Sequence, residues 1–273
     1  MASKVKALVV TGNGVNCEME TAHACRLAGA KVDIVTVYDL MAGRTRLDDY
    51  QFLNLAGGFL DGDDLGSAKA GANRWAHAKT LDRGERLLDQ LKRFIEADKL
   101  VMGVCNGFQL LVKLGILPGL ENRIGQTVTL TYNDSGRFED RWVHLLCDPK
   151  SPCIFTRDLG PGIFLPIRHG EGKLVTSGND VLEQIEQQHL APLKYSTSDY
   201  SKPAMEYPEN PNGSQNSIAG MCDSSGRILG LMPHPEAYTH KTNHPRWTRM
   251  PDLPKEGMGL KLFRNAVAWL DQA

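Results

Sequence analysis

A single cysteine occupies the sequence Gly-Val-Cys-Asn-Gly at positions 103–107, where the apolar run Leu100–Val104 meets a helical pattern. Small residues on both sides of Cys105 permit a tight turn from strand to helix, which is the cysteine version of a nucleophile elbow. The helix N-terminus would then favour the thiolate, the form that attacks a carbonyl carbon. The alternative is a buried thiol at the end of a strand, with glycines that serve only packing.

A histidine and a glutamate that could complete a catalytic triad lie far downstream. His234, Pro235 and Glu236 follow directly on an apolar run that ends at Met232. We expect His234 to stand at a strand end near the elbow, and Glu236 to fix the imidazole tautomer by bonding its second nitrogen. Taken alone, a His-Pro-Glu triplet is more often a surface turn. The buried strand before it and the order Cys, His, Glu favour the triad Cys105, His234, Glu236.

Two glycines end another apolar segment and suggest an oxyanion hole. Gly57 and Gly58 follow Phe52–Leu55, which is expected to be a strand of the same sheet. The backbone N–H groups of Gly58 and Asn106 would together bind the oxyanion of a tetrahedral intermediate. A glycine turn without any ligand is the alternative, and the adjacent elbow favours the hole.

Other polar groups do not form a convincing cofactor or metal site. Gly12-Asn13-Gly14 follows the first expected strand but lacks the full dinucleotide fingerprint. The acidic and histidine residues that could in principle bind a metal are Asp61, Asp63, Asp64, His144, His169, His240 and His244. Their spacing matches no metal motif, so we predict neither a metal site nor a cofactor in this chain.

The strands and helices that must position these residues are expected to form one α/β domain over residues 1–273. Short apolar runs alternate with helical patterns in the first third of the chain, as in a parallel sheet built from βαβ units. Asn16 is expected to cap the first helix, which should end near Gly29. The expected strands are Ala7–Val10, Val32–Val37, Phe52–Leu55, Leu100–Val104, Ile218–Cys222 and Arg227–Leu231.

The middle of the chain has a hairpin-like pattern, and two further helices carry apolar faces. A helix over Asn106–Leu114 should stop at Gly115, and apolar residues at helical spacing recur around Leu91 and around Phe263. The segments Thr127–Tyr132, Trp142–Leu146, Ile163–Ile167 and Lys173–Thr176 are expected as antiparallel additions to the same sheet. Ser196–Ser217, rich in Ser, Pro, Asn and Gly, predicts a long ordered loop or a contact surface.

Composition excludes several classes of protein. The net charge of −1 over 273 residues gives no electrostatic footprint for nucleic acid. No apolar run approaches the length of a membrane span or a signal peptide. Six cysteines without any Cys-x-x-Cys pair fit neither a zinc motif nor a disulfide framework. We therefore expect a cytoplasmic protein whose partners are found by shape and specific contacts.

Three motifs resemble the signatures of the class I, or triad, glutamine amidotransferases. They are Leu55–Phe59, Gly103–Gln109 and Met232–Glu236. Phe59, Asn106 and Phe108 make the chain most similar, within that class, to the glutaminases of phosphoribosylformylglycinamidine synthase. Further matches are Asn16-Cys17-Glu18, His169–Gly172 and Asn210–Ser214, so the resemblance spans nearly the whole chain.

The resemblance implies a fold, a reaction and a set of site residues. The fold would be the flavodoxin-like glutaminase fold, with a mostly parallel central sheet and antiparallel additions. The reaction would release ammonia from L-glutamine through a thioester on Cys105. By the family pattern, Gly58 and Asn106 supply the oxyanion hole, and the substrate-binding residues are Gln109, Phe59, His169 and Gly170.

The resemblance also implies partners. Ammonia would pass to an ATP- and Mg²⁺-dependent synthetase subunit of the purine pathway, aided by a small bridging subunit, and this chain would hold no cofactor itself. Leu60-Asp61 departs from the usual Ser-Tyr pair, and the tail from His244 resembles the long fused form of the enzyme.

The alternative functions are the glutaminase of another amidotransferase, a stand-alone γ-glutamyl hydrolase, a non-catalytic subunit, and a flavin- or nucleotide-binding module of similar fold.

Overall fold

Strands from both halves of the chain form one mixed sheet. A computed structural model describes residues 4–120 and 125–272. Within these residues, nine strands form the sheet in the order β2-β1-β3-β4-β11-β10-β9-β6-β7. They are β1 (Lys6–Thr11), β2 (Lys31–Thr36), β3 (Phe52–Leu55), β4 (Leu100–Val104), β6 (Glu139–Cys147), β7 (Gly162–His169), β9 (Leu193–Tyr195), β10 (Ile218–Cys222) and β11 (Ile228–Leu231). The predicted α/β class is confirmed.

The parallel half of the sheet runs from β2 to β11, and the strands beyond β11 pair antiparallel. Every residue of β3, β4 and β11 is buried, which is expected of parallel strands covered on both faces. Leu55 pairs with Gly103, and Val104 pairs with Leu231. The carboxyl ends of these three strands therefore meet at one edge.

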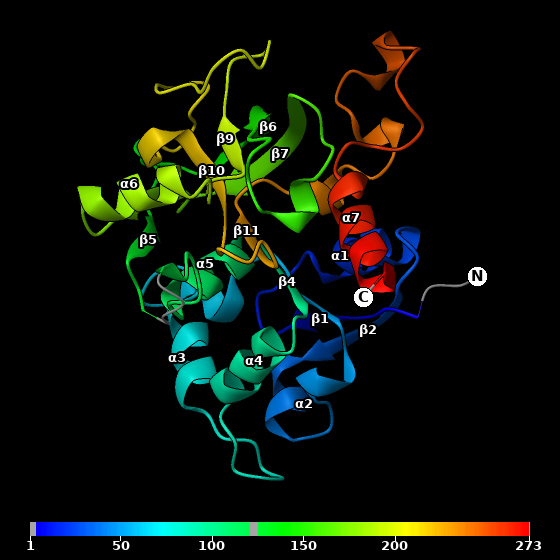
Figure 1. Cartoon of the computed structure of the whole chain (residues 1–273), viewed down its shortest axis with the longest axis vertical. Helices are drawn as coiled ribbons and strands as arrows, with labels where there is room; N and C mark the ends of the chain where they lie inside the picture. The colour runs from blue at the N-terminus through cyan, green and yellow to red at the C-terminus, as the bar shows by residue number, and fades with distance from the viewer. Residues whose placement is uncertain (1–3, 121–124, 273) are drawn as a thin grey trace.

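Helices cover both faces of the sheet (Figure 1). Helices α1 and α7 contact each other on one face, and α3, α4 and α5 lie on the other. The helices are α1 (Glu18–Leu27), α2 (Val37–Met41), α3 (Lys69–His77), α4 (Leu87–Glu96), α5 (Asn106–Lys113), α6 (Asn179–Gln187) and α7 (Leu260–Gln272). No helix in the described part of the chain is long and apolar enough to cross a membrane.

Two predictions about strands are wrong. Val128–Thr131 (β5) and Lys173–Thr176 (β8) pair with each other in a separate two-stranded sheet, so they are not additions to the central one. Val37 begins α2 and does not extend β2, because Thr36 and Asp39 form a reciprocal capping box that starts the helix there.

The start of α1 also differs from the prediction. Cys17 occupies the N-cap position and makes no side-chain cap bond. The carboxamide oxygen of Asn16 instead accepts a hydrogen bond from the Cys17 thiol, 3.3 Å away. The end of the helix agrees with the prediction, since Gly29 follows the C-cap with φ of 107°.

The long polar segment and the tail are held in place by buried contacts. Ser196–Ser217 is a loop, as predicted, and Asn212 within it donates to the Gly172 carbonyl oxygen at 2.9 Å and to the Tyr195 hydroxyl at 3.0 Å. In the tail, the His244 ring packs against Trp142 and Phe164, with centroids 5.8 and 5.4 Å away. The tail therefore covers the outer antiparallel strands.

The surroundings of Gly107 show how closely α5 packs on the sheet. A Cβ at Gly107 would lie 2.0 Å from the Leu55 carbonyl oxygen, so backbone would have to move. Helix propensity alone favours Gly107→Ala by about 1 kcal/mol, but overpacking costs about 1–3 kcal/mol or more. We expect Gly107→Ala to lower the free energy of unfolding in urea by about 2 kcal/mol. Gly125→Ala, with no atom near its new methyl, is the control. Equal stability of the two variants would contradict this packing.

Candidate active site

The backbone of Cys105 has the conformation of a nucleophile elbow. Its φ of 51° and ψ of −105° are unusual for a residue with a side chain, and it stands directly between β4 and α5. The Cys105 N–H donates to the Leu231 carbonyl oxygen at 2.8 Å, which ties the elbow to the neighbouring strand β11. A Cβ at Gly103 would lie 2.6 Å from the Gly107 carbonyl oxygen. The flanking glycines are therefore needed for the turn.

His234 and Glu236 form a buried pair just beyond β11. His234 Nδ1 lies 2.5 Å from Glu236 Oε1, and both side chains are almost fully buried. Burial alone would lower the pKa of His234, but the Glu236 carboxylate, together with the neighbouring Cys105 and Cys17 thiols, outweighs this effect. The pKa of His234 is therefore well above its usual value.

Cys105 and His234 line the same cavity. The Cys105 thiol interacts with the His234 ring and contributes to the stability of its charged form. Glu236 occupies Nδ1, and Nε2 is buried without a partner of standard hydrogen-bond geometry among the described residues. The Cys105 thiol donates weakly to the Arg168 carbonyl oxygen, 3.5 Å away.

The outer strand β7 reaches the same edge as the elbow. The His234 N–H donates to the Pro166 carbonyl oxygen at 2.8 Å, and the Arg168 carbonyl accepts from Cys105. β7 and β11 are separated by three strands in the sheet order. The antiparallel half therefore bends back over the ends of the parallel strands and forms one wall of the site.

The two residues predicted to supply the oxyanion hole, Gly58 and Asn106, both lie next to Cys105. Gly58 lines the same two cavities as Cys105, and its φ of 143° is open only to glycine, with a virtual Cβ 2.6 Å from the Gly14 carbonyl oxygen. Asn106 is the first residue of α5, where backbone N–H groups lack an acceptor within the helix. Gly58 and Asn106 both adjoin Cys105, and their role as an oxyanion hole stays a prediction.

The side chain of Asn106 organises the loop behind the elbow. Its Oδ1 accepts from the Leu60 N–H at 2.8 Å, and its Nδ2 donates to Asp63 Oδ1 and Gln109 Oε1, each at 2.8 Å. The Gln109 amide nitrogen donates to the Glu171 carbonyl oxygen at 2.6 Å. In this arrangement Gln109 holds the wall of the pocket, which is a contribution that the sequence motif alone does not reveal.

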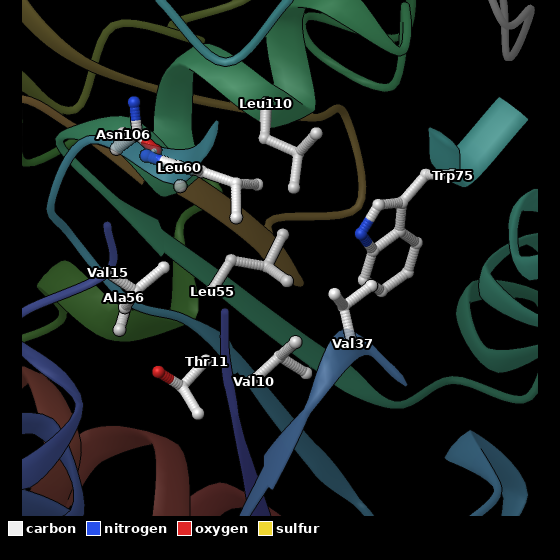
Figure 2. A pocket seen from close by; sticks show the side chains of 11 residues that line it. Val10, Thr11, Val15, Val37, Leu55, Ala56, Leu60, Trp75, Asn106 and Leu110 are labelled. Atoms are coloured by element: carbon white, nitrogen blue, oxygen red, sulfur yellow. Dashed lines mark hydrogen bonds between the residues drawn. The ribbon is translucent and has the colours of Figure 1, made fainter. Parts of the chain in front are cut away.

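Beneath this network lies an apolar floor. Figure 2 shows Asn106 and Leu60 above the side chains of Leu55, Val10 and Val37. The cavity that they surround has a volume of only about 20 Å³. It is too small for a substrate, so we assign it to packing under the site.

The predicted substrate-binding residues line a larger cavity next to Cys105. This cavity, of about 130 Å³, includes Phe59, Gln109, His169 and Gly170. His169 Nδ1 lies 3.1 Å from Asn133 Oδ1, and burial, followed by the charge of His234, lowers the His169 pKa to about 3. His169 is therefore neutral at physiological pH and acts as a wall of the pocket.

Several residues at the site were missed as functional candidates in the sequence. Asp63, Glu171 and Arg168 line the cavity beside Cys105, and Cys17 lines a second cavity of about 270 Å³ on the His234 side. Burial, as the largest cause, raises the pKa of Asp63, and the nearby charge of Glu171 also contributes. The motifs Asn16–Glu18 and His169–Gly172 contain or adjoin most of these residues, but nothing in their spacing shows that they meet.

The departure at Leu60-Asp61 is accommodated within the chain. Leu60 is buried in the apolar floor, and Asp61 forms a two-pronged ion pair with Arg74 at 2.6 and 3.0 Å. Neither side chain lines the cavities beside Cys105. These two side chains therefore support the loop and do not form the surface next to the nucleophile.

The family model for the CobB/CobQ-like glutamine amidotransferase domain matches residues 4–270. The chain belongs to the CobB/CobQ-like glutamine amidotransferase family. The prediction from the three motifs is thereby confirmed. The pocket around Cys105 is accordingly the candidate glutaminase site of this amidotransferase.

Relatives of this amidotransferase include both separate subunits and long proteins. The phosphoribosylformylglycinamidine synthase subunit PurQ of Dehalococcoides mccartyi is 44% identical, over 99% of this chain and 99% of that protein. Human phosphoribosylformylglycinamidine synthase is 36% identical over 97% of this chain, which corresponds to 20% of the human protein. A chain in the structure of PurLQS from Thermotoga maritima aligns with a TM-score of 0.71 at 28% identity, covering 98% of this chain and 99% of that one.

The buried His234–Glu236 pair predicts a specific pH dependence. Because the folded pKa of His234 is raised, its stabilising contribution is full below the unfolded pKa of about 6.5 and is lost as pH rises through the folded pKa. In Glu236→Gln, we expect the imidazole titration midpoint, followed by NMR, to fall. The free energy of unfolding near pH 6 should fall by about 2 kcal/mol, the usual value for a hydrogen bond to a charged group. The difference should shrink toward alkaline pH; an unchanged midpoint would contradict the pairing.

Proposed function

We propose that this amidotransferase is the glutaminase subunit of phosphoribosylformylglycinamidine synthase. It hydrolyses L-glutamine to glutamate and ammonia, and ammonia is delivered to a synthetase subunit in purine biosynthesis. The observation that carries the proposal is the elbow at Cys105, which stands at the same sheet edge as the buried His234–Glu236 pair. The relatives named as subunits of this synthase along their full length support the choice among amidotransferases.

The first chemical step follows from the charge state of the triad. Glu236 keeps His234 protonated, and an imidazolium beside a cysteine favours the thiolate. The thiolate attacks the carboxamide carbon of glutamine, and the N–H groups of Gly58 and Asn106 bind the oxygen that becomes negative. Collapse of this intermediate expels ammonia, with His234 as the proton donor, and leaves a thioester on Cys105.

The second step regenerates the thiol. The now neutral His234 removes a proton from water, which attacks the thioester carbon and releases glutamate. Glu236 holds Nδ1 throughout, so Nε2 is the nitrogen that exchanges protons. The cavity of about 130 Å³ that contains Gln109 and His169 is the proposed glutamine pocket.

The proposal assigns the ATP-dependent chemistry to a partner. The matched region is one fifth of the human synthase, so the remaining four fifths of that protein offer ample length for a synthetase. We infer that ATP and Mg²⁺ act in the separate synthetase subunit, with a small bridging subunit, and that this chain has no cofactor. All six cysteines are buried free thiols, as in proteins of a reducing compartment, so we include a cytoplasmic location.

Replacement of the nucleophile tests the reaction. Cys105→Ala should lower glutaminase turnover by at least about 1000-fold, because loss of a nucleophile removes the covalent route. Glutamate release is the measurement, and a glutamine-like electrophile should label Cys105 in the native protein. Cys147→Ala, at another buried thiol, is the control for non-specific effects. Near-normal turnover of Cys105→Ala would refute the proposal.

Activation by the partner separates this function from a stand-alone hydrolase. Ammonia release should rise at least about tenfold, a coupling of about 1.4 kcal/mol, when the chain is mixed with the formylglycinamide-ribonucleotide synthetase subunit, its substrate and ATP. The product amidine should form with glutamine as the only nitrogen source. Full activity of the isolated chain, without amidine formation in the mixture, would favour a γ-glutamyl hydrolase instead.

A further inference from the structure

A second thiol stands beside the triad and does not react with the substrate in the proposed reaction. Cys17 Sγ lies 3.9 Å from His234 Nδ1, the same nitrogen that Glu236 contacts at 2.5 Å. One ligand atom from each of these three residues lies within 4.8 Å of the other two. All three residues are buried. A soft sulfur, an imidazole nitrogen and a carboxylate oxygen therefore converge on one point.

We propose that Cys17, His234 and Glu236 form a binding site for a thiophilic divalent cation such as Zn²⁺. The bound cation inhibits the enzyme because it coordinates the imidazole of the triad. Cation binding goes beyond the proposed function and does not depend on it. Only the inhibition rests on the assigned role of His234.

The donor set and its spacing suit zinc. Zinc takes Cys, His and carboxylate ligands at about 2.0–2.3 Å, which places ligand atoms about 3.3–3.6 Å apart in a tetrahedron. The sulfur–nitrogen distance of 3.9 Å and the nitrogen–oxygen distance of 2.5 Å each need a change of about 1 Å or less to meet this geometry. Side-chain rotations of Cys17 and Glu236 can supply such changes.

An unused ligand atom supports the site independently. Glu236 Oε2 is buried and has no hydrogen-bond partner among the described residues. A buried carboxylate oxygen without a partner is costly, and coordination of a cation would satisfy it. Oε2 can therefore coordinate the cation without giving up a hydrogen bond of its own.

A path to the site and an open coordination position are both present. Cys17 and His234 line the cavity of about 270 Å³ that also borders Cys105. This cavity leaves room for water as a fourth ligand, or for the Cys105 sulfur. Arg168 lines it with a positive charge that opposes a cation, whereas Glu20 lines it with a negative charge that offsets Arg168.

The consequence for the triad is direct. A cation on Nδ1 occupies the nitrogen that Glu236 contacts and draws the Glu236 carboxylate away from the imidazole. The imidazole is then held by the cation and is no longer oriented by Glu236 for proton exchange in the triad. Inhibition should therefore be reversed when a chelator removes the cation.

Cobalt absorbance measures the site without any need for activity. Co²⁺ bound to a thiolate gives a charge-transfer absorption band. Cys105→Ser lacks the nucleophile but retains Cys17, so it should still show this band. Added Zn²⁺ should displace Co²⁺ and remove the band. In a protein that retains Cys105, Cys17→Ser should bind Co²⁺ at least about 100-fold more weakly, since even outer-shell losses cost about 10- to 100-fold. Cys25→Ala, on the same helix, is the matched control and should bind as the native protein does.

Glu236→Gln provides a second test if Cys17→Ser fails to fold, and it should weaken Co²⁺ binding at least about tenfold. Zn²⁺ should inhibit native glutaminase, and Cys17→Ser should resist inhibition relative to its own metal-free rate.

Loss of the band in Cys105→Ser would make the nucleophile a required ligand and overturn the three-residue site. An undiminished band in Cys17→Ser, or no Co²⁺ binding by the native protein, would overturn it as well. Binding without inhibition would overturn the inhibitory role.

Discussion

The backbone of Cys105 is the constraint on which the rest of the site depends. A non-glycine residue in such a conformation costs about 1–3 kcal/mol, so surrounding structure must impose it. Here β4 is buried along its whole length, the Cys105 N–H bonds to β11, and Gly107 lets α5 approach Leu55 to backbone contact. The thiol is consequently lifted to the sheet edge where β3 and β11 also end. Its position follows from packing that is complete before any substrate arrives.

Charge is the second constraint, and burial makes it effective. Desolvation opposes a charged His234. The Glu236 carboxylate and the other polar neighbours together have the opposite effect, and this effect is larger. Because the pair is screened little by water, the imidazolium can act strongly on the thiol at Cys105. The same concentration of donor atoms makes the site attractive to a soft cation once Cys17 is included. Reactivity and sensitivity to metal thus have a common physical origin.

The sequence predicted the parts of the site that depend on local rules. The elbow at Cys105 was readable because glycines, a buried strand and a helix start lie within a few residues. The strand before His234 was readable from its apolar run. By contrast, the pairing of β5 with β8, and the meeting of Arg168 with Cys105, depend on contacts between distant segments. No periodicity within either segment specifies such a partner.

Local chemistry also misled where two choices compete. Asn16 is a good cap by type, but its carboxamide oxygen is used by the Cys17 thiol, and Cys17 takes the cap position instead. Val37 suits a strand by type, yet the side chains of Thr36 and Asp39 each accept a hydrogen bond from the other residue's backbone N–H. The helix therefore begins at Val37, which was predicted to be the last residue of the strand. In both cases a specific hydrogen bond outweighed a residue preference of a few tenths of a kcal/mol, as expected from typical magnitudes.

The unusual Leu60-Asp61 pair shows which features near the site are open to change. Asn106 holds the loop through the backbone N–H of Leu60, so this bond does not depend on the side chain at position 60. The Leu60 side chain only has to fill the apolar floor, and Asp61 only has to match Arg74. A change at these positions is therefore compatible with the same conformation of the loop. Asn106 has no such freedom, because both ends of its carboxamide are engaged by groups that shape the pocket.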